Sequence, residues 1–154
     1  MNYEALLIEA DSCQLRVKEK PLKQHDGLIV GDRIAIRKDI STLAEKSCVL
    51  AEELGHYYTT SGNILDQSNV NNQKQEQRAR LWAYNKKIGL YGIINGYKAG
   101  CRNATELAEY LNVTEEFLLE AITQYRNKYG ICKEIDNYVI FFIPNLAVME
   151  RISN

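Results

Sequence analysis

Residues 42–58 constrain the fold more than any other segment, because they combine a helix start signal with a long apolar face. Thr42 and Glu45 form a capping box, in which each side chain bonds the backbone N–H of the other residue. Apolar residues then recur at the spacing of one helix face in LAEKSCVLAEELGHYY. We therefore predict a helix over 42–58. This helix places Glu52 and His56, four residues apart, on one face.

The ionisable residues of this helix match the requirements of a hydrolytic zinc site. Zinc binds imidazole nitrogen and carboxylate oxygen, and a catalytic site needs three protein ligands, a water and a general base. Glu52 and His56 are candidate ligands, and Glu53 lies beside them on the helix. Because the chain has two histidines, a three-histidine site is excluded. The third ligand is then a carboxylate on a neighbouring helix, and Glu76 is the candidate.

A solvated helix face is the alternative interpretation of the same residues. The pattern acid–acid–x–x–His also occurs by chance, and charged helix faces commonly point to water. Two features favour a bound cation. Glu52 and Glu53 lie in the last two turns of the helix, where the helix dipole disfavours negative charge by some tenths of a kcal/mol. They also lie in its most apolar part, beside Ala51 and Leu54.

Composition indicates an ordinary globular protein with one domain, or one domain and a small appendage. The chain has 154 residues, of which 45% are hydrophobic and 25% charged. No apolar run reaches the roughly 18 residues of a membrane helix, and the start lacks a basic signal-peptide region. The four cysteines form no C-x-x-C pair, so we expect buried, reduced cysteines in a cytoplasmic protein. The net charge of -1 gives no footprint for nucleic acid.

The periodicity along the chain predicts an α+β fold. Helical spacing covers 3–13, and alternation predicts a small antiparallel sheet whose second and third strands turn at Gly31-Asp32. A polar loop over 59–72 follows the helix at 42–58, and strong helix formers resume after it. Gly100 is able to end the next apolar helix. The expected strands are 14–19, 27–30 and 33–37, and the expected further helices are 73–87 and 88–99.

The tail predicts a helix–turn–helix followed by a hairpin. Asn103 and Thr114 are capping residues for two helices, and Gly130 ends the second one. A hairpin follows, with its turn at Asp136-Asn137 and Pro144 closing it. The second helix begins with two glutamates, which would face phosphate in a DNA complex. A platform for a protein partner, or for packing on the rest of the chain, is therefore favoured over a DNA-binding wing.

Two stretches together resemble the ImmA/IrrE family of zinc metallopeptidases. CVLAEELGHYYTT corresponds to the His-Glu-x-x-His helix of that family, and QEQRARLWA corresponds to a following helix with the pattern Glu-x-x-Ala-x-x-aromatic-Ala. The second pattern is in register at Glu76, Ala79, Trp82 and Ala83. The resemblance covers about residues 3–95 well and the tail loosely. It implies a zincin-like helical core, a metallopeptidase-like domain over 1–100 and a winged-helix-like C-terminal subdomain over 101–154.

The resemblance also implies roles for individual residues. His56 and Glu76 correspond to zinc ligands, and Glu53 corresponds to the base that activates water and protonates the leaving amine. The departure is Glu52, which stands where the family usually has the first histidine. A carboxylate there leaves the Zn²⁺ centre less positive and its water less acidic. We therefore expect zinc binding, with cleavage that is slow or that needs a partner to complete the site.

In the family, such proteins often inactivate phage-type helix-turn-helix repressors by cleavage. The resemblance thus implies a cytoplasmic peptidase from a phage or mobile element, with one repressor as its substrate and neither nucleic acid nor a membrane as a direct partner. Two alternatives stay open: a non-catalytic regulator that holds the repressor through a structural or vestigial metal site, and a DNA-binding regulator. Among nearby side chains, Tyr57 or Tyr58 could stabilise an oxyanion, but core packing is the safer interpretation for both, as for Trp82.

Overall fold

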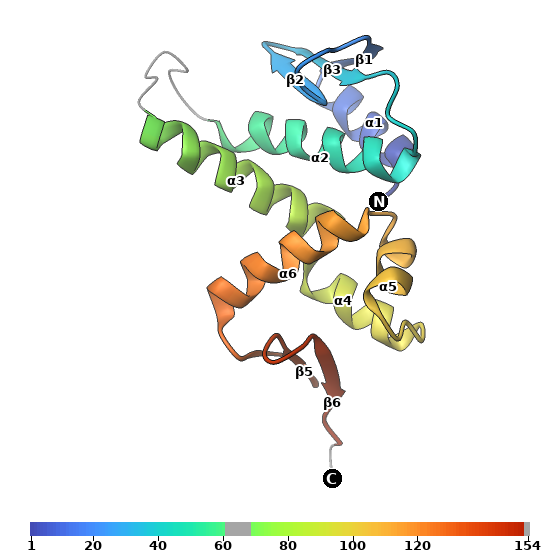
Figure 1. The fold of residues 1–154 in the computed structure, drawn as a ribbon, viewed down its shortest axis with the longest axis vertical. Helices are drawn as coiled ribbons and strands as arrows, with labels where there is room; N and C mark the ends of the chain where they lie inside the picture. The colour runs from blue at the N-terminus through green and yellow to red at the C-terminus, as the bar shows by residue number, and fades with distance from the viewer. Residues whose placement is uncertain (61–68, 153–154) are drawn as a thin grey trace. The chain divides into compact units, whose positions relative to one another are not determined.

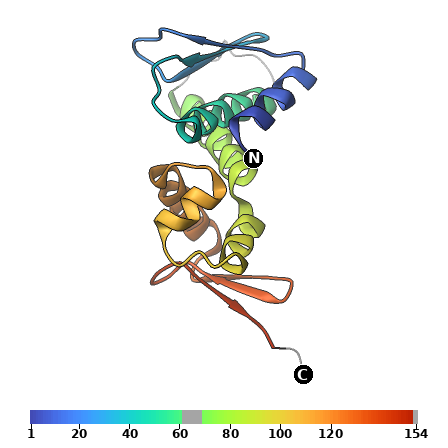
Figure 2. The same cartoon turned by 90° about the vertical axis from the view of Figure 1, so that its right-hand side faces the viewer.

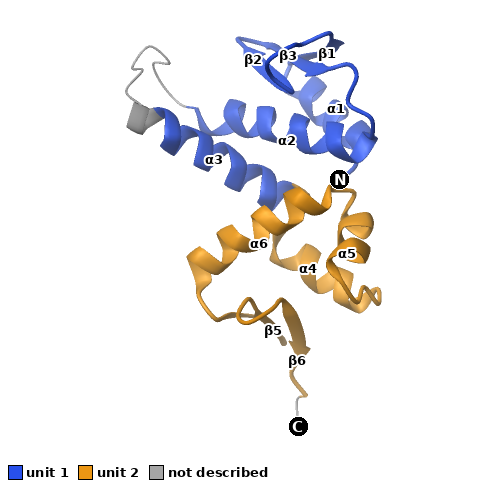
Figure 3. Ribbon diagram, viewed as in Figure 1, with its two compact units in different colours: residues 1–86 blue, residues 87–154 orange. Residues whose placement is uncertain are grey.

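The computed structural model describes residues 1–60 and 69–152, and its fold is α+β (Figure 1). Helices and two three-stranded sheets alternate along the chain. The chain divides into two compact units, Met1–Lys86 and Lys87–Asn154 (Figure 3). The described elements are α1 (Tyr3–Ser12), β1 (Arg16–Lys20), β2 (Gly27–Val30), β3 (Arg33–Arg37), α2 (Leu43–Thr59), α3 (Asn69–Lys87), α4 (Gly89–Lys98), α5 (Ala104–Leu111), α6 (Glu115–Tyr129), β4 (Cys132–Ile135), β5 (Tyr138–Phe141) and β6 (Ala147–Glu150).

The sheet of the first unit is mixed, with the strand order β1-β3-β2. β2 and β3 form the predicted antiparallel hairpin, whose turn residue Gly31 has a φ of +60°. The prediction of an all-antiparallel sheet is wrong, because β1 pairs with β3 in parallel. Alternating burial shows which face of a strand is covered, but it does not reveal which neighbour the strand takes. Here the segment after β1 carries β2 to the opposite edge of β3.

One face of this sheet packs on the helices α1 and α2, and no helix in the described part of the chain covers the other face (Figure 2). α1 contacts β1, while α2 contacts β2 and β3. Ile34 and Ile36 of the central strand point to this helical side and are at most 2% exposed. Leu6, Leu50 and Leu54 of the two helices are fully buried. The hydrophobic core of the unit therefore lies between the sheet and the helices α1 and α2.

α2 confirms the prediction for 42–58, from its cap to its end. The Thr42 hydroxyl accepts a hydrogen bond from the backbone N–H of Glu45 at 3.1 Å. α3 begins at Asn69, four residues before the predicted start. Most of the predicted polar loop, residues 61–68, lies outside the described residues. α3 therefore begins in residues 69–72, whose asparagines and valine are weak helix formers, which is why the sequence placed them in the loop.

The second unit contains the predicted helix–turn–helix and a second sheet. Asn103 and Thr114 cap α5 and α6 through their side chains, as expected. β4 and β5 form the predicted hairpin, in which Asp136 at the turn has a φ of 50°. β6 pairs with β5 and adds a third strand to the sheet, which was not predicted from the sequence. The sequence of β6, Ala147–Glu150, does not alternate, because three apolar residues stand in a row before Glu150.

The cysteines do not all behave as predicted. All four are free thiols, but only Cys48 is buried, while Cys132 is exposed and the other two are intermediate. A small apolar side chain can stand at a half-exposed position at little cost, so composition alone does not fix its depth. In the described part of the chain, no helix is both long and apolar enough to cross a membrane.

Candidate active site

The helices α2 and α3 cross with their backbones almost in contact. A Cβ added at Gly55 would stand 2.3 Å from the carbonyl oxygen of Ala79. Both residues are buried, and Ala79 is fully so. Only a glycine on α2 and a small residue on α3 permit this approach. The crossing brings the residues next to Gly55 and those one turn before Ala79 within reach of each other.

His56 and Glu76 meet at this crossing. The imidazole Nε2 of His56 lies 3.2 Å from the carboxylate Oε1 of Glu76. The His56 side chain is 22% exposed and that of Glu76 is 54% exposed, so the pair is accessible from solvent. The structure therefore brings together two of the predicted ligands, which come from different helices and stand 20 positions apart in the sequence.

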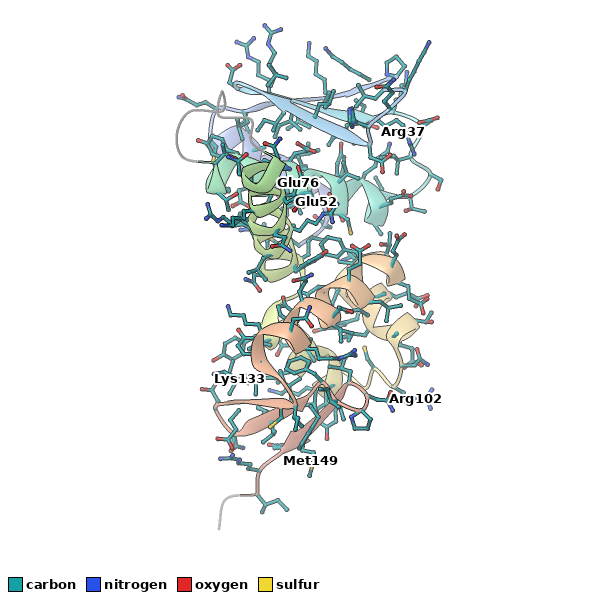
Figure 4. The ribbon with its side chains drawn as sticks, turned by 60° about the vertical axis from the view of Figure 1, so that its left-hand side comes forward. Arg37, Glu52, Glu76, Arg102, Lys133 and Met149 are labelled. Carbon is teal, nitrogen blue, oxygen red and sulfur yellow. The ribbon has the colours of Figure 1, made fainter. Side chains whose placement is uncertain are left out.

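Glu53 lies beside this pair, on the side of α2 that faces β2. Burial, together with the negative charges of Glu52 and Glu76, raises the pKa of its carboxyl to about 7. Figure 4 labels these two flanking carboxylates, one on α2 and one on α3. The three carboxylates are close enough for their repulsion to act on Glu53, and this repulsion favours a bound proton on its carboxyl.

Gly27 of β2 leaves the space that the Glu53 side chain occupies. A Cβ at this position would stand 3.0 Å from Glu53 Oε1 and 2.7 Å from the Cγ1 methyl of Val49. Val49 and Glu53 are four residues apart and share the face of α2 that contacts β2. β2 therefore forms one wall of the site, and Gly27 allows the Glu53 side chain to lie close against it.

The candidate ligands are of the types that bind zinc, and the structure brings two of them, His56 and Glu76, close together. Imidazole nitrogen and carboxylate oxygen are ordinary zinc ligands, and the convergence of His56 and Glu76 provides one of each. Within residues 1–60 and 69–152, no group of three His, Cys, Asp or Glu side chains is arranged to hold a metal ion. The three-ligand set with Glu52 stays a prediction.

The two tyrosines near the C-terminal end of α2 are not core residues, contrary to the prediction. Tyr57 is 40% exposed and Tyr58 is 42% exposed. The Tyr58 ring stacks on Trp82 of α3 with the ring centres 4.9 Å apart, and its hydroxyl lies 2.9 Å from the Cys13 sulfur. An amphipathic ring can be covered by one neighbour and keep its edge in water. Trp82 is half-buried and so is not a core residue either, although its ring covers Tyr58 of α2.

Sequence reasoning identified the ionisable residues but missed the residues that position them. Gly27 and Gly55 carry no chemistry of their own, yet each one leaves room for a close approach. The signal for Gly55 was present, because a glycine inside a helix costs about 1 kcal/mol relative to alanine and usually has a packing reason. No comparable signal exists for Gly27, which stands at the start of a strand.

The comparison with known families covers the whole site. A family model described as the IrrE N-terminal-like domain, of peptidase family M78, matches residues 10–134. The chain belongs to this family. The match includes α2, α3 and every predicted site residue, and it continues through α6 into β4. The resemblance to ImmA/IrrE metallopeptidases is thereby confirmed at the level of the family. No curated protein and no solved structure matches the chain.

Proposed function

We propose that this member of the M78 family is a zinc-dependent endopeptidase with a zincin-like core. The observation that carries the proposal is the 3.2 Å distance between His56 Nε2 and Glu76 Oε1. The carboxyl of Glu53, whose pKa is about 7, lies beside them. His56, Glu76 and Glu52 would hold the ion. Glu52 stands four residues before His56 on α2. Side chains at this spacing lie on the same face of a helix, so both can reach one metal ion.

In this proposal Glu53 moves the proton during peptide hydrolysis. A zinc ion, when bound, polarises the scissile carbonyl and makes water more acidic. The Glu53 carboxylate then accepts a proton from the attacking water and delivers it to the leaving amide nitrogen. A carboxyl whose pKa is near 7 suits both steps, because it gives up and accepts a proton with comparable ease at neutral pH.

The substrate proposed for this site is a phage-type helix-turn-helix repressor, which cleavage would inactivate. This partner follows from family membership, since the resemblance to ImmA/IrrE peptidases implies it. Cleavage of a single regulator would let an intracellular peptidase act without damage to other proteins. The proposal places the chain in the cytoplasm, where such a repressor acts.

A second candidate function is that of a regulator that binds the repressor without cleaving it. Glu52 favours this alternative, because the family usually has a histidine there. Two carboxylates and a neutral imidazole cancel the charge of Zn²⁺, whereas two imidazoles and one carboxylate leave +1. The more neutral centre makes its water less acidic, so a metal could be held for structure with little turnover.

Metal content tests the ligand set before any substrate is known. The purified protein is compared by elemental mass spectrometry with Glu52→Gln, His56→Ala and Glu76→Gln variants, and with an exposed-site control, Glu116→Gln. We expect near-stoichiometric zinc in the parent and the control, and loss of zinc in each of the three variants. A parent protein without metal after zinc is supplied would contradict the zinc site.

Cleavage separates the two candidate functions. The protein is incubated with the repressor of the same mobile element, and products are identified by mass spectrometry. Glu53→Gln is expected to abolish cleavage and to leave zinc content and repressor binding unchanged. Glu52→His is expected to increase cleavage, because it restores the more positive centre. Inactivation of the repressor that survives Glu53→Gln would support the binding regulator instead.

A further inference from the structure

The outer face of the β1–β3–β2 sheet carries a group of cations that form no ion pair with any described residue. The side chains of Arg16, Lys18 and Lys20 alternate along β1 on the face away from the helices, and Arg33 of β3 lies beside Arg16 in the parallel register. Figure 4 shows nitrogen-tipped side chains standing on this face of the sheet. All four residues are exposed.

Three other cations of this unit form ion pairs, and one of them, Arg37, lies beside Lys20 on the same outer face. Lys46 binds Glu19, Lys86 binds Glu9, and Arg37 binds both Asp26 and Asp39. The four cations of the outer face form no ion pair with any described residue. A chain with a net charge of -1 thus concentrates an unneutralised charge of about +4 on one sheet face.

The same face has an apolar side along β2. Leu28 is 39% exposed and Val30 is 74% exposed, and both point outward from the edge strand. Ala35 lies at the centre of the face, with Arg33 and Arg37 before and after it on β3, and its small side chain leaves a trough between Lys18 and Leu28. These residues line a groove of about 450 Å³. Its two banks therefore differ in character, with cations along β1 and aliphatic side chains along β2.

The dimensions of the trough match an α-helix. Two strand spacings of about 4.8 Å separate Lys18 from Leu28, so the banks stand about 10 Å apart, which is the diameter of a helix. Alternate residues on β1 are about 6.6 Å apart, and residues i and i+4 of a helix rise by about 6 Å. A helix laid along β1 can therefore present one carboxylate to each cation in turn.

We propose that this face binds an amphipathic helix of a partner protein, one with acidic residues at i, i+4 and i+8 and an adjacent aliphatic stripe. The acidic stripe lies on Arg16, Lys18 and Lys20, and the aliphatic stripe lies on Leu28 and Val30. The proposal is independent of the peptidase chemistry, because none of these residues belongs to the candidate active site.

Charge and composition favour a protein helix over nucleic acid as the occupant. Proteins that hold single strands stack bases on aromatic side chains, and the groove has no aromatic residue in its lining. A phosphate backbone would satisfy the cations but would leave Leu28 and Val30 against a polar surface. An acidic amphipathic helix satisfies both banks.

Fluorescence anisotropy with a labelled peptide of about 18 residues tests the proposal. The probe contains glutamate, leucine and alanine arranged in the two stripes, and the control peptide has the same composition in scrambled order. Titrations use the full chain at about 0.05 M and about 0.5 M salt. We expect the striped peptide to bind about ten-fold more tightly than the scrambled one, and its affinity to fall about ten-fold at the higher salt.

Variants locate the binding face. Lys18→Glu with Arg33→Glu is expected to weaken binding of the striped peptide more than ten-fold, and Leu28→Ser about three-fold. The matched control, Lys74→Glu with Arg78→Glu, makes the same charge change on exposed residues of α3 and is expected to change affinity less than two-fold. Circular dichroism confirms that each variant is folded, which is expected because all these side chains are exposed.

Three results would overturn the proposal. Equal affinity for the scrambled peptide, or an equal effect of the α3 control, would mean that net charge alone attracts acidic peptides. Tighter binding of single-stranded oligothymidylate than of the striped peptide would identify the face as a nucleic-acid site. Salt-sensitive self-association in sedimentation experiments, lost in the Lys18→Glu and Arg33→Glu variant, would identify a second copy of the chain as the occupant.

Discussion

Gly55 of α2 lies against the backbone of Ala79 of α3. There is no room for a side chain at Gly55, because an added Cβ would stand 2.3 Å from the Ala79 carbonyl oxygen. This contact precedes His56 by one residue and follows Glu76 by one turn. The two predicted ligands can meet at 3.2 Å because the helices approach this closely. The geometry of the candidate site therefore depends on a residue without a side chain.

Gly55→Ala is expected to separate α2 from α3 and to lower both stability and metal content. Backbone atoms cannot move aside as a flexible side chain does, so we expect a loss of about 2–4 kcal/mol in the free energy of unfolding. Guanidinium denaturation and elemental mass spectrometry measure the two effects. The control is Gly92→Ala in α4, where the nearest atom is a leucine methyl at 3.3 Å. A Gly55→Ala protein with unchanged stability would contradict the close crossing.

Stability of the metal-free protein is expected to fall as pH rises from about 4.5 to about 7, because of Glu53. Its pKa is about 7 in the folded protein and 4.5 as a free side chain, so the folded state holds the proton more tightly. Its contribution is therefore fully present below pH 4.5 and is lost as pH rises through 7. Glu53→Gln should remove this loss and increase stability at pH 8 by roughly 1–3 kcal/mol.

Urea denaturation of the chelator-treated protein at pH 5 and pH 8 measures this effect. The comparison is between the parent and Glu53→Gln at each pH, so that titration of all other groups cancels. The exposed-site variant Glu116→Gln should follow the parent at both values. A Glu53→Gln protein that is less stable than the parent at pH 8 would show that the carboxylate is stabilised in the folded state.

Gly27→Ala is expected to disturb catalysis more than folding. The new Cβ would meet Glu53 Oε1 at 3.0 Å and the Val49 methyl at 2.7 Å, and both are side-chain atoms that can shift. Displacement of the proposed base should lower kcat about ten-fold, with zinc content and KM little changed. Repressor cleavage assays measure this split. Leu28→Ala, on the opposite face of the same strand, is the control, and an equal loss there would rule out a specific effect on Glu53.

Tyr58→Phe is expected to destabilise the first unit slightly. The Tyr58 hydroxyl contacts Cys13 at 2.9 Å and Glu9 at 3.4 Å, and Glu9 keeps its ion pair with Lys86 when the hydroxyl is lost. The expected cost is about 0.5–1 kcal/mol, because the site is partly exposed and water can replace the bond. Chemical denaturation measures it, with Tyr57→Phe as the control. Tyr58→Ala should cost more, since it also removes the stacking on Trp82.

Local sequence signals account for most helix boundaries in this protein. The caps at Thr42, Asn103 and Thr114 and the stop at Gly130 act through hydrogen bonds or backbone angles within a few residues, so the sequence carries the full information. Strand pairing is different. The parallel partner of β1 and the addition of β6 depend on contacts between distant segments, which alternation does not encode.

For the site, the residues and their spacing were enough to predict the zinc ligands and to place Glu52, Glu53 and His56 on one helix. A period of 3.6 residues suffices for that second inference. Which of these groups meet, and the pKa of Glu53, depend on how the helices and the sheet pack. The contact of His56 with Glu76, the burial of Glu53 and the cationic face of the sheet all arise where separate segments pack, because close approach and desolvation are properties of the folded chain.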